Sequence, residues 1–406
     1  MTTPIPRDDR LPQMQQLLDL EAIAPILARS IGPDAEIGSV QINYLRYKPG
    51  RDLCVHYTAD VAGESHDAVA FLAPQENLRA EAERADYRER AARAAARCPA
   101  ASPLTYDPEL QVLLHWLPFE LDLPALTEAP AAVRERVALA GADIAQSEDE
   151  LVMLQYRPRR RAALRLDAYV AKIYRNEAGY ATGVSGLERA ARLGSIRTAT
   201  CHAVVPEWRL TLQDFLPGDS PPLRAAVACD AGALLAEMHA VRLEGLDPLL
   251  PEQRLRNAAV SVKIVATVAP QLAARARALL RELELAAPQL DEDVVTSHGD
   301  FHGGQLLLQP QGLAVIDFDL LGAAPPAFDI ATYAGHLVPN EARDIEAAAD
   351  ALEDLVAGYG SRPPWLPWYL SASLLRRARV PFRNFDSNWP DGVETMVSAA
   401  EAALKL

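Results

Sequence analysis

Three oxygen-bearing side chains in the last third of the chain have types and spacing that suit chemistry. The stretch VVTSHGDFHGGQLLL, residues 294–308, contains Asp300 and Gln305, and Asp317 follows in IDFD, across a short apolar hairpin. Carboxylate and amide oxygens are ligands that Mg²⁺ takes up beside phosphate groups. A carboxylate on such a loop can also orient an attacking hydroxyl. The spacing therefore indicates a combined magnesium and proton-acceptor site.

The same stretch contains two histidines, so a zinc cluster is the alternative. His298 and His302 flank Asp300 at alternate positions, and zinc sites use imidazole and carboxylate ligands. However, VVTSH has the pattern of a strand and two glycines follow, which argues against a helical His pair. None of the other six histidines belongs to a second clustered pair. We expect a structural role for His298, and either loop support or substrate contact for His302.

A second pair of residues lies more than a hundred positions upstream. In AYVAKIYRNEAGYATGVSGLERAARLG, Lys172 is at the end of an apolar strand and Glu188 lies in the following helix. A lysine held by a carboxylate positions nucleotide phosphates in kinase-type folds. The pair therefore predicts a phosphate-binding lysine.

Together these motifs resemble a known family. HGDFHGGQ … IDFD … FDIATY is similar to the H-G-D-x-H-x-x-N … D-F … D-I/L pattern of aminoglycoside phosphotransferases. Choline kinases and sugar kinases of the same protein-kinase-like superfamily share this pattern. Gln305 replaces the usual Asn, as in maltokinase-like and glucosamine-kinase-like relatives with H-G-D-x-H-x-G-Q. The resemblance covers residues 150–335 well and the helical tail loosely.

The resemblance implies a role for each motif residue. Asp300 is the implied catalytic base, and Asp317 and Gln305 are the implied Mg²⁺ ligands. Lys172 would bind the α- and β-phosphates of ATP or GTP, braced by Glu188. The other implied residues are the nucleotide hinge, Gln213, Asp214 and Phe215, and the catalytic-loop supports, His298, His302 and Asp329.

The hairpin that would cover the phosphates departs from kinase patterns. It has the sequence RPRRR, with no glycine to let backbone amides approach a phosphate. Arg159 and Arg160 are predicted to act as phosphate donors in their place. The alternative is that these arginines only solvate the tip of the hairpin.

The C-terminal tail gathers aromatic and basic residues in PPWLPWYLSASLLRRARVPFRNFDSNWP. Sugar pockets favour aromatic faces, and in the resembled family the acceptor binds in the helical part. An ordinary helical core, or pairing of the arginines with local acids, is the alternative. The candidate acceptor contacts are Trp365, Trp368, Tyr369, Arg376 and Arg377.

The first half of the chain contains an internal repeat. YLRYKPGRDLCVHY, 44–57, resembles MLQYRPRRRAALRL, 153–166, and Glu89 aligns with Glu188 further along. In the first copy Phe71 lies near the position that Lys172 occupies in the second. We therefore predict that the first copy binds no nucleotide and forms a cap on the second copy or a homodimer surface.

These elements predict an α+β, protein-kinase-like bilobal fold. It combines a small β-rich N-lobe and a large, mainly helical C-lobe with an additional degenerate N-lobe-like repeat at the N-terminus. The predicted domains are a cap at 1–145, a nucleotide-binding N-lobe at 146–218, and a helical C-lobe with the catalytic loop and acceptor site at 219–406.

Composition narrows the environment and the partners. The 406-residue chain has a net charge of −15, which argues against a nucleic-acid backbone as main partner and favours a cationic acceptor. No apolar run is long enough for a membrane span, and no secretory signal is expected. Four scattered cysteines fit reduced thiols and a cytoplasmic protein.

The predicted function is a small-molecule kinase that acts on a hydroxyl group. The acceptor would be an amino sugar, a sugar, an aminoglycoside-like antibiotic or a related metabolite. The alternative is a catalytically weak, kinase-like binding or regulatory protein. Lys172, Glu188, Asp300 and Asp317 are all present, and a pseudokinase need not keep this set.

Overall fold

The computed structural model describes residues 3–145, 147, 149, 151–221, 225–289, 293–340 and 345–406. The chain forms two compact units. The first unit consists of Met1–Tyr180, His202–Gln213 and Phe382–Trp389, and the second of Ala181–Cys201, Asp214–Pro381 and Pro390–Leu406.

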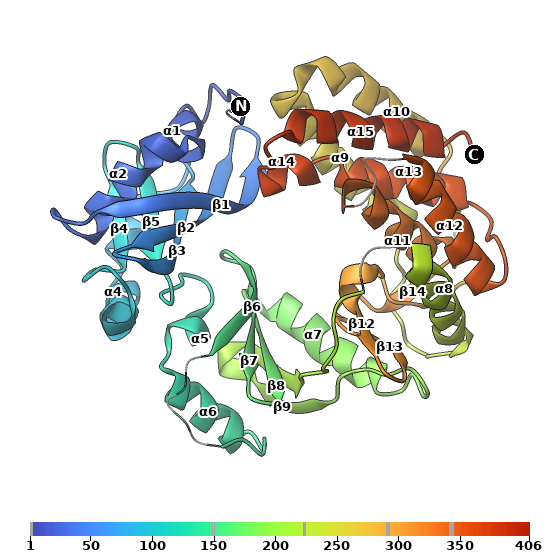
Figure 1. Cartoon of the computed structure of the whole chain (residues 1–406), viewed down its shortest axis with the longest axis horizontal. Coiled ribbons are helices and arrows are strands. Elements are labelled where there is room, and N and C mark those ends of the chain that lie inside the picture. Colours follow the sequence, from blue (N-terminus) through green and yellow to red (C-terminus); the bar gives the residue numbers. More distant parts are fainter. Residues whose placement is uncertain are drawn as a thin grey trace. The chain divides into compact units, whose positions relative to one another are not determined.

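The first unit contains two five-stranded sheets with the same topology (Figure 1). One has the strand order β1-β2-β3-β5-β4 and the other β6-β7-β8-β10-β9. This shared order agrees with the internal repeat in the sequence. The strands are β1 (Ile37–Lys48), β2 (Asp52–Val61), β3 (Glu64–Leu72), β4 (Leu104–Asp107), β5 (Val112–Trp116), β6 (Val152–Arg157), β7 (Arg161–Leu166), β8 (Tyr169–Tyr174), β9 (Cys201–Val205) and β10 (Leu210–Asp214).

The strand register aligns the two copies residue by residue. Seven residues after the shared tyrosine of the first strand, Cys54 pairs with Phe71 in one sheet, and Ala163 pairs with Lys172 in the other. Phe71 therefore stands in the first sheet where Lys172 stands in the second.

The two sheets share one apolar core. Cys54 and Phe71 of the first sheet belong to the same buried cluster as Ala171 and Ile173 of the second. Burying these side chains stabilises each sheet against the other, at about 25 cal/mol per Å² of apolar surface. The helices of this unit are α1 (Met14–Leu18), α2 (Leu20–Ile31), α3 (Leu78–Ala82), α4 (Ala85–Ala94), α5 (Pro124–Thr127) and α6 (Pro130–Leu139), and α7 (Glu177–Ala190) begins in it.

A short segment from the C-terminal part completes the first unit. Phe382 packs edge-on against Tyr47 of β1 and against Trp389, and the Trp389 indole N–H donates to the Pro4 carbonyl at 2.9 Å. Apolar contact explains this placement, because Phe382 and Trp389 are both buried. The aromatic residues of the tail are thus divided between the two units.

The second unit is mainly helical and contains two small antiparallel sheets. The short apolar hairpin predicted between Gln305 and Asp317 is confirmed, since Gln309 pairs with Gly312 at its tip. The strands are β11 (Val295–Ser297), β12 (Leu306–Gln309), β13 (Gly312–Val315) and β14 (Gly322–Ala324). The helices are α8 (Ala225–Ala240), α9 (Pro251–Val268), α10 (Ala273–Leu285), α11 (Ala327–Asn340), α12 (Ile345–Tyr359), α13 (Leu366–Arg377), α14 (Val380–Asn384) and α15 (Trp389–Ala403), of which α14 continues into the first unit.

Close backbone approach fixes several elements of the second unit. A Cβ at Gly232 of α8 would lie 2.1 Å from the Leu355 carbonyl of α12, and one at Gly358 would lie 1.9 Å from the Cys229 carbonyl. Only glycine permits such contact between helices. The predicted α+β fold, with a β-rich N-terminal part and a mainly helical C-terminal part, is confirmed. None of the helices in the described residues has the length and apolar character that crossing a membrane requires.

Candidate active site

The loop after β11 is fixed by one buried carboxylate, that of Asp329 in the first turn of α11. Its Oδ2 accepts hydrogen bonds from the Ser297 hydroxyl at 2.8 Å and the His298 backbone N–H at 2.7 Å. Its Oδ1 accepts from the Gly299 N–H at 3.0 Å. Burial alone would raise the pKa of Asp329, but these donors and the nearby imidazoles lower it below the usual value. Asp329 therefore stays ionised and holds the loop.

A histidine that sequence reasoning missed completes this arrangement. His239, near the end of α8, has Nε2 at 3.2 Å from Asp329 Oδ2 and Nδ1 at 3.1 Å from the Tyr359 hydroxyl. It is buried, with 3% of its surface exposed. In the sequence it is a lone histidine on an apolar helix, and nothing nearby in the chain distinguishes it.

His298 joins the loop to the strand that follows it. The Asp300 N–H donates to His298 Nδ1 at 3.3 Å, so the ring proton is on Nε2, which donates to the Ile316 carbonyl at 3.0 Å. Gly299 between them has φ +83°, and a Cβ there would meet the Leu320 carbonyl at 2.2 Å. The glycine of the HGD motif is therefore required by geometry.

The two predicted Mg²⁺ ligands lie together. The side-chain amide nitrogen of Gln305 donates to Asp317 Oδ2 at 3.1 Å, and the Ile316 N–H donates to the backbone carbonyl of Gln305 at 2.9 Å. Gln305 is buried, and Asp317 has φ +68°, a conformation unusual outside glycine. The hairpin thus brings together an amide and a carboxylate that are twelve residues apart.

His302 forms a stack with a second histidine that the sequence interpretation did not include. Its ring lies 3.8 Å from that of His336, at an interplanar angle of 12°, and its Nε2 is 3.8 Å from Asp300 Oδ2. Burial lowers the pKa of His302 to about 4. Arg377 Nη1 is 2.6 Å from His336 Nε2. His336 follows Asp329 by seven residues on α11, and this spacing places both on one helix face, a signal that the sequence contained.

The candidate acceptor residues of α13 have different environments. Arg376 Nη2 lies 3.9 Å from Asp300 Oδ1, and Arg377 reaches the histidine stack. Trp368 is buried and donates its indole N–H to the Leu283 carbonyl at 2.9 Å, and Tyr369 is also fully buried. Trp365 is 48% exposed before the start of α13. The two arginines therefore lie at the loop, while Trp368 packs against α10.

The predicted nucleotide residues belong to both units. Lys172 is half-buried in β8 and Gln213 is buried in β10, both in the first unit. Glu188 is exposed on α7, and Asp214 accepts from the Thr200 N–H at 2.8 Å, in the second unit. The pairing of Lys172 with Glu188 and the hinge role of Phe215 stay predictions.

Arg159 has protein partners in the first unit. Its guanidinium donates to Asp122 at 2.8 Å and to Glu81 at 3.0 Å, and lies 4.1 Å from the centre of the Phe71 ring. Only 4% of Arg159 is exposed, whereas its neighbour Arg160 is exposed. The hairpin tip thus inserts one arginine beside Phe71, which occupies in the first sheet the position of Lys172 in the second.

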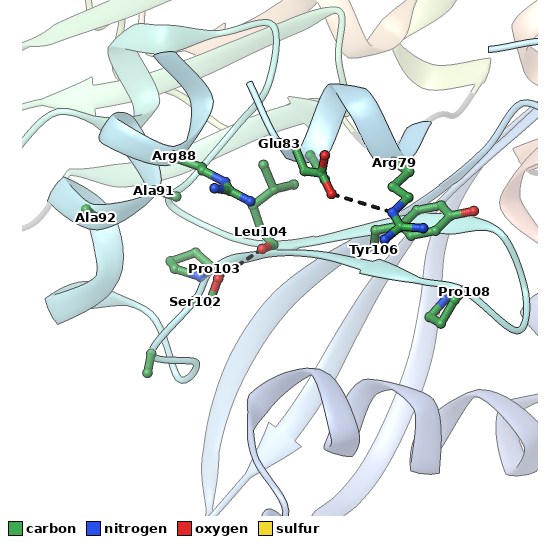
Figure 2. Close-up of a pocket in the computed structure, with 12 residues that line it drawn as sticks. Arg79, Glu83, Arg88, Ala91, Ala92, Ser102, Pro103, Leu104, Tyr106 and Pro108 are labelled. Atoms are coloured by element: carbon green, nitrogen blue, oxygen red, sulfur yellow. Dashed lines mark hydrogen bonds and ion pairs between the residues drawn. The ribbon is translucent and has the colours of Figure 1, made fainter. Parts of the chain in front are cut away.

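A cavity of about 620 Å³ lies in the first copy, between helices α3 and α4 and strand β4 (Figure 2). Its polar groups largely satisfy each other: Arg79 pairs with Glu83 at 3.5 Å, and Ser102 donates to the Leu104 carbonyl at 3.0 Å. Both ends of the ion pair are exposed. None of the described residues that line this cavity belongs to the loop around Asp300.

Residues 203–369 match the phosphotransferase enzyme family (APH). The family resemblance predicted from the HGD and IDF motifs is thereby confirmed. This phosphotransferase-family segment contains Asp300, Gln305, Asp317 and Asp329, while Lys172 lies before it. The comparison with curated proteins gave no match.

Several solved structures have similar backbones. A choline/ethanolamine kinase family protein from Mesorhizobium loti has a TM-score of 0.49 and 14% identity, covering 69% of this chain and 96% of that one. Choline kinase from Cryptosporidium parvum has a TM-score of 0.49 and 12% identity, covering 65% and 91%. An aminoglycoside phosphotransferase from Streptomyces rimosus has a TM-score of 0.46 and 16% identity, covering 60% and 97%. Identities this low describe backbone likeness alone.

Proposed function

We propose that this chain is an ATP- or GTP-dependent phosphotransferase that phosphorylates a hydroxyl group of a small molecule. The main support is the fixed loop: Asp300 follows two residues whose backbone N–H groups are both bound by the buried Asp329 carboxylate. A carboxylate on a loop held in this way suits the orientation of an attacking hydroxyl. The acceptor would be an amino sugar, a sugar, an aminoglycoside-like antibiotic or a related metabolite.

Asp317 and Gln305 would hold magnesium. Their side chains already touch, and carboxylate and amide oxygens are the donors that this cation prefers. Turning the Gln305 amide about its terminal bond exchanges its nitrogen for its oxygen, so the pair fits a cation. When bound, Mg²⁺ would neutralise charge on the transferred phosphate.

Nucleotide binding would use Lys172 on β8 and the hinge around Gln213, Asp214 and Phe215. Gln213 Oε1 is buried and has no hydrogen-bond partner among the described residues. Lys172 would bind the α- and β-phosphates, with Glu188 as its brace. Arg160, exposed at the hairpin tip, is the better candidate for an additional phosphate contact, because Arg159 already binds two carboxylates.

We further propose that the first copy, 1–145, is a cap on the nucleotide-binding N-lobe at 146–218 and that it binds no nucleotide itself. The helical C-lobe would be 219–406. The supporting observation is the pair of Phe71 at the lysine position and Arg159 over its ring. A bulky aromatic ring and a guanidinium would occupy the space that phosphates need. Homodimer formation and a cytoplasmic location stay predictions.

A zinc-dependent hydrolase is the second candidate. Ligand atoms of Asp300, His302 and His336 lie within 4.8 Å of one another, which is compatible with a metal ion. The Arg377 guanidinium at 2.6 Å from His336 Nε2 puts a positive charge where the cation would bind. We therefore favour the phosphotransferase, and stoichiometric zinc in the purified protein would reverse this preference.

The lysine assignment is tested by Lys172→Ala. We expect it to lower kcat/KM for the nucleotide by at least about 100-fold, as removal of one preorganised charge contact does. Lys263→Ala, an exposed lysine on α9, is the matched control. Turnover of a panel of sugars, amino sugars and antibiotics with Mg-ATP is the measurement. A Lys172→Ala variant as fast as wild type would rule out the assignment.

The proton-acceptor assignment is tested by Asp300→Asn, an isosteric change that removes the charge. We expect kcat to fall about 10²- to 10⁴-fold, with Mg-ATP still raising the melting temperature. Asp230→Asn, at an exposed position on α8, should retain full activity. If the wild type binds Mg-ATP but transfers phosphate to no acceptor, the pseudokinase alternative is preferred. No stabilisation by any purine nucleotide would favour a protein that binds none.

A further inference from the structure

A small cavity opens beside the catalytic loop in the second unit. It has a volume of about 90 Å³, which corresponds to a few water molecules. Its walls come from the segment before α9, from α9 itself, from the loop around Gly299, and from α13. The described residues that line it are Leu249, Leu250, Gln253, Arg254, Asn257, Gly299, Leu320, Phe328 and Arg376. None of these is acidic, and two are arginines.

Arg254 is the more unusual of the two arginines, because only 5% of it is exposed. Its Nη2 donates to the Thr332 hydroxyl at 2.7 Å and the Phe328 carbonyl at 3.2 Å, and its guanidinium lies 3.7 Å from the Phe328 ring centre. Its Nε and Nη1 are buried and have no hydrogen-bond partner among the described residues. The neutral partners fix the side chain but supply no counter-charge.

Arg376 approaches the same cavity from α13. Its Nη2 lies 3.9 Å from Asp300 Oδ1, and its buried Nε has no hydrogen-bond partner in the described part of the chain. Burial lowers the pKa of Arg254 to about 9, and the positive charge of Arg376 adds to this effect, while Asp329 and Asp300 partly oppose it. Two guanidinium groups that repel each other around one cavity leave donor capacity for an anion.

We propose that this cavity binds a carboxylate or phosphate group of the acceptor, held between Arg254 and Arg376, while the hydroxyl of the same molecule faces Asp300. The placement of the acceptor hydroxyl at Asp300 rests on the proposed function, whereas the binding of an anion in the cavity does not. An arginine fork matches two oxygens of a carboxylate or phosphate at once. The wall of Leu249, Leu250 and Leu320 suits the carbon frame beside the anionic group.

This reverses the acceptor charge that the composition predicted. The net charge of −15 favours a cationic partner for the molecule as a whole, but the charge preference of a pocket depends on the residues that line it. A polycationic acceptor would place its ammonium groups beside two arginines, where Asp300, 3.9 Å from Arg376 Nη2, is an opposing charge. Among the proposed acceptors, the pocket therefore selects acidic metabolites over aminoglycoside-like antibiotics.

Anion binding is tested first, without any need for catalysis. Calorimetry would compare D-glucuronate, D-glycerate and inorganic phosphate with the uncharged glucose and glycerol and the cationic glucosamine, with and without Mg²⁺ and a non-hydrolysable ATP analogue. We expect the wild type to bind at least one anion more tightly than its uncharged or cationic counterpart. In Arg376→Gln, that affinity should fall about 10- to 100-fold, because charge-assisted hydrogen bonds are lost.

Matched variants keep the result interpretable. Arg256→Gln changes an exposed arginine on the same helix as Arg254 and should bind the anion as wild type does. Arg254→Lys and Arg376→Lys keep the charge and should recover part of the affinity. Because Arg254→Gln removes a buried side chain, Arg376→Gln, whose side chain is 26% exposed, remains informative if the former does not fold.

Turnover with Mg-ATP forms the second arm and separates the two hypotheses. Transfer to an acidic acceptor, with KM raised in Arg376→Gln more than kcat is lowered, would support both. Anion binding lost in the variants, with no transfer to any acceptor, would support the anion site and contradict the proposed function. The inference is overturned if no anion binds more tightly than its uncharged or cationic counterpart, or if Arg376→Gln binds the anion as tightly as the wild type does. It is also overturned if Arg376→Gln turns over a cationic acceptor as fast as the wild type does. Preference for glucuronate and glycerate over phosphate would identify a carboxylate.

Discussion

Asp329 holds the loop that leads to Asp300. Its two oxygens accept from a hydroxyl and two backbone N–H groups, and His239 approaches from α8. A carboxylate buried in this way is stable only because its donors replace the lost water. Asp300 follows these donors, and its own N–H donates to His298 Nδ1, so its backbone is held by the same loop.

Removal of the Asp329 carboxylate should destabilise the loop that this carboxylate holds. We expect Asp329→Ala to lower the free energy of unfolding by about 3 kcal/mol or more, since several buried donors lose their acceptor. Chemical denaturation measures this, with Asp350→Ala, exposed on α12, as the control. An unfolding free energy within about 0.5 kcal/mol of wild type would contradict the role given to Asp329.

The two sheets of the first unit illustrate how elements are held together by unlike interactions. Apolar residues of both sheets form one core, and hydrogen bonds and ion pairs also link the two copies. Buried Glu120 accepts from the Tyr156 hydroxyl and from the Arg159 N–H, and Arg159 in turn binds Asp122 and Glu81. The hairpin tip of the second copy is thus fixed by acids of the first.

Arg159→Ala should destabilise the contact between the sheets. Breaking a largely buried charge pair on one side costs about 3 kcal/mol, because two carboxylates are left without their partner. Arg160→Ala, one residue away and exposed, should change stability by less than about 0.5 kcal/mol. Equal stability of the Arg159→Ala and Arg160→Ala variants would contradict the role given to Arg159 between the sheets.

If Arg160 contacts a phosphate, Arg160→Ala should raise KM for ATP.

The response of the whole molecule to acid should reflect its buried carboxylates. Burial would raise the pKa of Glu120, but His115, Tyr156 and the Arg159 N–H lower it to about 2. An unfolded glutamate titrates near 4.3. The stabilisation by ionised Glu120 is therefore complete above about pH 4.3 and decreases as the pH falls towards 2.

Glu120→Gln tests this dependence. Between pH 4.3 and 2, the wild type should lose unfolding free energy more steeply than the variant, by on the order of 3 kcal/mol over the interval. At pH 7 the variant should already be less stable. Thermal unfolding across this pH range is the measurement, and parallel curves for the two proteins would show that Glu120 does not titrate as described.

The amino-acid sequence determined the motif residues and the repeat, because both depend on local order. The HGD and IDF motifs are short, and the Asp317–Gln305 contact follows from one hairpin whose turn the chain itself specifies. The similar residues around Tyr47 and Tyr156 indicated the duplication, and the two five-stranded sheets have the corresponding strand order.

Tertiary structure alone decided the contacts between residues distant in the chain. His239 lies 90 residues before Asp329, and Arg254 lies on a helix far in sequence from Arg376, so no spacing brings them together. The same is true of Arg159, whose charge suggested a phosphate contact but whose partners come from the first copy. Arg254 has only neutral hydrogen-bond partners and Arg376 lies 3.9 Å from Asp300, so the acceptor is expected to supply a further negative charge.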